Sequence, residues 1–141
     1  MEKFSAQDII RGRFYSLWIN GDKFAEVKSG SGESALNTED VPIAGSLGNE
    51  TIVTGAKGTG TLTFHKTYNG LLKQINAQIS AGKAFKFDLI SELNDPNQSG
   101  YERVCIDGCT ITKFKAIDVD ITKLLEQSFD YSYNPTKVTY E

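Results

Sequence analysis

Few residues in this sequence could carry out chemistry. His65 is the only histidine, and Cys105 and Cys109 are the only cysteines. Nucleophilic catalysis needs a nucleophile, a base and an orienting group together, and structural metal sites usually need about four Cys or His ligands. We therefore expect His65 to be a surface or interface residue and both cysteines to be free thiols. No metal and no cofactor is predicted.

Two other groups of residues could bind an ion. Asp118 and Asp120 share one face of a predicted strand, and paired carboxylates can hold a cation or move protons, but a solvated strand face explains them more simply. Gly55–Thr61 reads GAKGTGT and lacks the GxxxxGK[ST] spacing of a phosphate-binding loop. Its glycines are interpreted as sites of turns, bulges or close backbone approach. The sequence thus predicts no active site, and we expect no enzyme.

Composition limits the class of protein. The 141 residues, of which 39% are hydrophobic and 23% charged, fit a single soluble domain over residues 1–141. The net charge of -3 argues against a nucleic-acid binder. No apolar run reaches the roughly 18–20 residues of a membrane span, and the N-terminus lacks the apolar region of a secretory signal. We expect a chain made in the cytosol that does not insert into membranes.

Two dipeptides favour hairpin turns. Asn20-Gly21 and Asp107-Gly108 suit a type I′ turn, in which both central residues have positive φ. Each is therefore predicted to connect two strands. The predicted strand pairs are Tyr15–Ile19 with Lys23–Val27, and Tyr101–Ile106 with Cys109–Phe114.

Alternating polar and apolar residues predict the remaining strands, and one stretch changes to a helical period. Leucine and isoleucine at helical spacing predict an amphipathic helix over 70–81, capped by Asn69 and ended by Gly82. The fold class is therefore mainly β with one helix, an antiparallel β-sandwich or partly closed barrel. The alternating strands are Thr59–Phe64, Phe85–Ile90, Ala116–Ile121 and Ser128–Tyr133, followed by a short tail at Thr136–Glu141.

The segment from Gly30 to Gly60 fits none of these patterns. It holds seven of the 13 glycines, and unstructured connections longer than about 12–15 residues are uncommon in compact domains unless they have a function. Its apolar residues are too few for a core and too many for a solvated linker. We expect an irregular segment that becomes ordered against a second copy or a partner. Those residues are Val41, Pro42, Ile43, Leu47, Ile52 and Val53.

In their order and spacing, these features resemble the tail tube proteins of contractile phage-like tails, as found in defective prophages and tail-derived bacteriocins. The resemblance covers Tyr15–Tyr133 and is carried by WINGDKFAEVKS, TEDVPIAG, GAKGTGTLTFHKTY, the helix and SFDYSY. It implies a non-enzymatic structural protein whose sheets join into a continuous β-barrel in a hexameric ring. Stacked rings would form the tube that a contractile sheath drives through a cell envelope.

The resemblance also implies partners and surfaces. Partners would be further copies, the tail sheath protein, the tape-measure protein and baseplate proteins, with DNA passing only in a DNA-injecting phage. The protein would assemble in the bacterial host cytoplasm and end in the tail particle. Residues 38–57 would contact the next ring through the six apolar residues named above. The residues expected to face the lumen are Thr59, Thr61, Thr63, Ser128, Asp130 and Ser132.

Two alternatives remain open at this stage. A small ligand-binding β-barrel would place Phe85, Phe87, Phe129 and Tyr131 around a pocket. The tube protein of a type VI-like secretion device would share the fold and the ring assembly. The first differs from a tail tube protein by remaining monomeric, and the second would be distinguished by its neighbouring genes.

Overall fold

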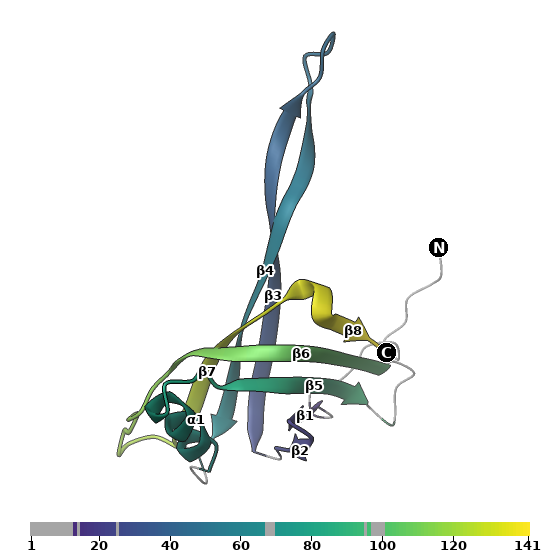
Figure 1. Ribbon diagram of the computed structural model, residues 1–141. Coiled ribbons are helices and arrows are strands. Elements are labelled where there is room, and N and C mark those ends of the chain that lie inside the picture. The colour runs from purple at the N-terminus through teal and green to yellow at the C-terminus, as the bar shows by residue number, and fades with distance from the viewer. Residues whose placement is uncertain (1–12, 14, 25, 67–69, 95, 97–100) are drawn as a thin grey trace.

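The computed structural model describes residues 13, 15–24, 26–66, 70–94, 96 and 101–141. Over these residues it shows one eight-stranded sheet in the order β2-β1-β5-β6-β7-β4-β3, with β8 paired to β6, and one α-helix (Figure 1). All strand pairs are antiparallel and the sheet is not closed, so the prediction of a mainly β fold with one helix is confirmed. The elements are β1 (Tyr15–Ile19), β2 (Asp22–Lys23), β3 (Val27–Pro42), β4 (Asn49–His65), α1 (Gly70–Ser80), β5 (Lys86–Asn94), β6 (Tyr101–Phe114), β7 (Glu126–Tyr133), the 3-10 turn η3 (Pro135–Lys137) and β8 (Val138–Tyr140).

The Gly30–Gly60 segment is the largest difference from the sequence-based expectation. It is not irregular, because β3 and β4 pair along almost their whole length as a long hairpin that projects from the body (Figure 1). Most of its side chains are exposed on both faces. Without a buried face there is no alternation of apolar and polar residues, so the sequence does not reveal the two strands.

The two hairpin dipeptides have different structures. Asn20 and Gly21 have φ values of 52° and 84°, which confirms the turn between β1 and a shorter second arm, β2. The prediction of a hairpin at Asp107-Gly108 is wrong, because both residues lie within the continuous strand β6. Gly108 has a φ of 72° in a bulge opposite Asp88, and its N–H donates to Asp88 Oδ1 at 3.0 Å. A bulge with glycine in the left-handed region and a type I′ turn both use positive φ, so the dipeptide alone does not separate them.

The helix confirms its prediction. Ile75 of the helix is fully buried, and Gly82, just beyond the end of the helix, has a φ of 76°. The N–H groups of Gly82 and Lys83 donate to the carbonyls of Ile79 and Gln78, each at 2.9 Å, which is the hydrogen-bond pattern of a Schellman cap. The proposed cap Asn69 lies outside the described residues.

Two expectations near the C-terminus are wrong. Residues 115–125 form no strand, because Asp120 closes a local turn by accepting hydrogen bonds from the N–H and hydroxyl of Thr122. The supposed tail Thr136–Glu141 contains η3 and the strand β8, which pairs with Val104–Ile106 of β6. β8 pairs with a distant part of the chain, and residues 115–125 form a local turn instead of a strand, so local alternation did not predict either outcome.

The aromatic residues that a ligand-binding barrel would need around its pocket form the core instead. Phe85, Phe87, Phe129 and Tyr131 are all buried. The rings of Phe87 and Tyr131 pack edge to face with centroids 6.0 Å apart. They belong to one hydrophobic core, against which Leu71 and Leu72 of the helix also pack.

Candidate assembly surfaces

Three cross-strand pairs form a polar face on β4 and β7. Register places Thr59 opposite Ser132, Thr61 opposite Asp130, and Thr63 opposite Ser128. Thr61 Oγ1 donates to Asp130 Oδ1 at 3.0 Å, and the hydroxyls of Thr63 and Ser128 lie 3.2 Å apart. The structure thus brings together all six residues that the sequence assigned to a lumen. We call these six residues the hydroxyl face.

The opposite side of the same two strands is apolar. Leu62 and Phe64 alternate with the threonines and are buried, as are Phe129 and Tyr131 on β7. Because side chains of a strand point alternately to its two faces, burying these four forces the hydroxyl face outward. Each strand therefore has one face in the core and one toward water.

Charges beside the hydroxyl face are few and of both signs. On β3, Glu33 is opposite Thr59, and on β6, Lys113 is opposite Asp130. At the base of the face, Lys28 forms an ion pair with Glu126. The hydrogen bond from this lysine lowers the pKa of the Glu126 carboxyl.

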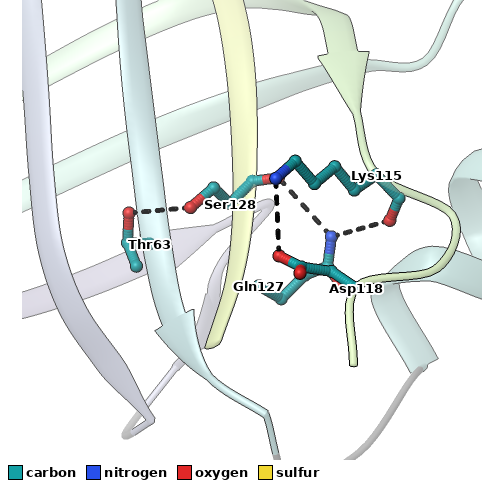
Figure 2. A network of polar contacts seen from close by, with 5 residues as sticks. All are labelled: Thr63, Lys115, Asp118, Gln127 and Ser128. Carbon is teal, nitrogen blue, oxygen red and sulfur yellow. Dashed lines mark hydrogen bonds and ion pairs between the residues drawn. The ribbon is translucent and has the colours of Figure 1, made fainter. Parts of the chain in front are cut away.

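A buried glutamine ties the hydroxyl face to the segment that follows β6 (Figure 2). Gln127 is 5% exposed, and its Nε2 donates to the carbonyl of Lys115 at 3.0 Å. Its neighbour Ser128 contacts Thr63 on the outer side of the sheet, and Lys115 reaches Asp118 at 3.8 Å. The end of β6 and the start of β7 are thereby held at a fixed separation.

Glycines in the lower part of the hairpin make room for tyrosine rings. A Cβ at Gly58 would lie 2.3 Å from the ring of Tyr133, and one at Gly60 would lie 2.2 Å from the carbonyl oxygen of Ser31. Tyr131 donates its hydroxyl to that Ser31 carbonyl at 2.8 Å, and burial raises the pKa of Tyr131. This packing was not predicted, although the sequence carries its signal: glycines at every second position opposite the tyrosines of YSY.

The structure does not gather the predicted stacking residues on one surface. Alternation and register place Val41 and Ile52 on one side of the hairpin and Val53 on the other. Ile43 and Leu47 lie in the turn and are exposed, and Pro42 pairs with Asn49. A register shift between Asn37 and Thr38 marks where this outer part of the hairpin begins. We call Thr38–Thr54 the distal hairpin.

The residues considered for chemistry lie apart. His65 is exposed at the base of β4, and Cys109 is fully buried, which raises the pKa of its thiol to about 12. Asp118 and Asp120 each lie 3.8 Å from a lysine Nζ. Across the described ranges, no three His, Cys, Asp or Glu side chains are grouped to hold a metal. In the same ranges, no helix has the length and apolar character needed to cross a membrane.

Comparison with known proteins shows which proteins the chain resembles in sequence and fold. A family model described as phage tail tube protein matches residues 2–139. Over 131 residues the chain is 28% identical to the phage-like element PBSX protein XkdM of Bacillus subtilis (strain 168), covering 91% of this chain and 88% of that protein. The tube terminating cap of the anti-feeding prophage has the same fold, with a TM-score of 0.76 at 14% identity over 99% of this chain and 95% of that chain. A chain of the PVC sheath-tube complex, an extracellular contractile injection system, also has a TM-score of 0.76, at 13% identity over 96% of this chain and 93% of that chain.

Proposed function

The chain belongs to the phage tail tube protein family, and from this premise we propose that it polymerises as stacked hexameric rings into the inner tube of a contractile phage-like tail. It is a structural component of a phage or phage-like tail particle. In this proposal residues 1–141 form one tube domain, and the assembled tube is the conduit driven through the target envelope. The observation that carries the proposal is the long edge strand β3.

An edge strand of this length needs a partner. β3 has 16 residues and pairs with β4 on one side only, among the residues that the structure describes. Its other side presents unpaired backbone groups, which proteins normally cover or blunt. A neighbouring copy in a ring would satisfy them.

Strand order favours closure into a barrel. From β6 through β7 and β4 to β3, each strand is antiparallel to the next, so β3 and β6 run in opposite directions. Residues 112–114 of β6 extend beyond its pairing with β5. Joining β3 of one copy to this part of β6 in the next therefore continues the antiparallel pattern, and repeating the contact by rotation closes a ring.

The hydroxyl face would then line the channel, and the segment 38–57 would contact the adjacent ring. Hydroxyl groups with few charges give a wet surface that binds a passing polymer weakly. The surrounding sheath protein, a tape-measure protein in the lumen and the baseplate are the further proposed partners. Assembly would take place in the host cytoplasm, and DNA would pass only in a DNA-injecting phage.

Purified full-length protein should form rings and tubes as its concentration rises. Sedimentation velocity would show species far larger than the subunit, and negative-stain electron microscopy would show hollow tubes. A small ligand-binding barrel would stay monomeric because its edges would be satisfied within one copy. A concentrated solution that contains only single subunits would therefore contradict the proposal.

The lumen assignment is tested with a cysteine at position 61. In a Cys105→Ser background, Thr61→Cys should react with a bulky polymer-linked maleimide in free subunits but at least tenfold more slowly in tubes. Iodoacetamide, which is small enough to enter from the ends, should label the cysteine in both states. Equal labelling of tubes and subunits by the bulky reagent would place residue 61 on the outer wall. Thr136→Cys, at an exposed position away from the hydroxyl face, provides the comparison.

A further inference from the structure

Residues 115–125 expose an unusual amount of apolar surface. Ile117, Val119, Ile121 and Leu124 are 83%, 61%, 97% and 92% exposed. Single exposed apolar side chains are ordinary, but four large ones in one short segment mark an interaction site. We call residues 115–125 the apolar loop.

Hydrogen bonds give the apolar loop a defined shape. At its start, the Lys115 carbonyl accepts from Gln127 Nε2 at 3.0 Å. At its end, the Leu125 carbonyl accepts from the Lys66 N–H at 2.9 Å. In the middle, Asp120 accepts from the N–H and hydroxyl of Thr122 at 3.0 and 2.7 Å. These bonds fix the two ends and the central turn of the loop, and its four apolar side chains are exposed in this arrangement.

The apolar loop and the turn of the distal hairpin lie at opposite ends of the molecule (Figure 1). The hydrogen bond from Lys66 to Leu125 places the end of the loop next to Lys66, which directly follows β4. From Lys66, the 17 residues of β4 lead back to the hairpin turn. This length is roughly 50 Å at the rise of an extended strand. When copies are stacked along this strand, the hairpin turn of one copy points toward the loop of the next.

The two surfaces also complement each other. The distal hairpin exposes Leu47, Ile52 and Val53, which match the apolar character of the loop. The charged residues of the distal hairpin, Glu39, Asp40 and Glu50, are all acidic. In the loop, Lys115 and Lys123 each lie 3.8 Å from an aspartate, Asp118 and Asp120, so residues 115–125 carry no excess charge of their own. Apolar contact is therefore the main source of the complementarity.

We propose that the apolar loop is the receptor for the distal hairpin of a second copy in the adjacent ring. This rests on the tube assembly proposed above and adds which surface receives the hairpin. The contact joins two different surfaces and does not close on itself, so it extends without limit along the tube axis. It also explains why Ile121 and Leu124 are exposed in the single subunit.

The test uses two variants that each lose one side of the contact. The loop variant carries Ile121→Asp and Leu124→Asp, and the hairpin variant carries Ile43→Asp and Leu47→Asp. Because all four side chains are exposed, both variants should show the circular dichroism and melting temperature of the unassembled wild type. Each alone should form no tubes in electron microscopy. A mixture should form only pairs of rings, since the intact loop of one accepts the intact hairpin of the other.

Controls separate this proposal from the tube proposal. Ile79→Asp alters an exposed apolar residue of α1 outside the contact and should form tubes as the wild type does. Tubes of wild-type length from the loop variant would overturn the receptor role and leave the tube proposal intact. Absence of tubes from the wild type and from Ile79→Asp would instead overturn the tube proposal, and the receptor role with it.

Cross-linking gives a second readout that does not depend on disrupting the contact. A Cys105→Ser chain that carries Leu47→Cys and Leu124→Cys should assemble and, with a short bis-maleimide, give a ladder of covalent oligomers. Either cysteine alone should give no ladder beyond the dimer, because each contact would then lack one thiol. Assembled tubes that contain both cysteines but give no ladder would also contradict the proposal.

Discussion

Deleting Thr38–Thr54 should yield a folded subunit that forms no tubes. The deletion removes the distal hairpin and joins Asn37 directly to Gly55. Leu36 and Ala56 are already register partners, so the new Asn-Gly dipeptide can close a two-residue type I′ turn between them. The core lies entirely outside the deleted residues, and the body should therefore keep its fold.

Electron microscopy and sedimentation measure the loss of tubes, and circular dichroism with thermal unfolding checks the fold. We expect the average tube length to fall from many rings to one ring or less, while the melting temperature changes by only a few degrees. The truncated chain keeps its apolar loop, so added in excess it should also shorten wild-type tubes. Normal tubes from the truncated chain would show that the distal hairpin has no part in stacking.

Replacing Gly60 by valine should strongly destabilise the subunit. A Cβ at this position would lie 2.2 Å from the carbonyl oxygen of Ser31 and about 2.5 Å from the ring of Tyr131. The first of these atoms belongs to the backbone of the paired strand β3, so relief requires β3 and β4 to separate locally. Overpacking of this kind costs about 3 kcal/mol of folding free energy.

Urea unfolding of the unassembled subunit measures this cost. Gly55→Ala is the matched control on the same strand, because its Cβ would only make an ordinary contact at 3.5 Å with Asn37. We expect the control to lie within about 0.5 kcal/mol of the wild type. If Gly60→Val unfolded at the same urea concentration as Gly55→Ala, the close packing of tyrosine rings on the hairpin would be wrong.

The elements that depend on neighbouring residues could be predicted from the sequence. Asn20-Gly21 supplies two positive φ angles, and the α1 pattern ends at Gly82 because glycine suits a left-handed position. The hydroxyl face also follows from the sequence, since a period of two separates its threonines and serines from the buried residues of the same strands. These are properties of short stretches of chain, independent of what they pair with.

Pairing between distant segments decided the rest. Only the tertiary structure shows that β3 and β4 form one long ladder, that Gly108 lies in a bulge and that β8 joins β6. It also leaves Ile117 and Ile121 in water, although their alternation indicated the buried face of a strand. Local patterns report whether a face is buried within the subunit. The distal hairpin and the apolar loop are both exposed in this subunit. Alternation of apolar and polar residues was therefore absent from the distal hairpin and misleading in the apolar loop.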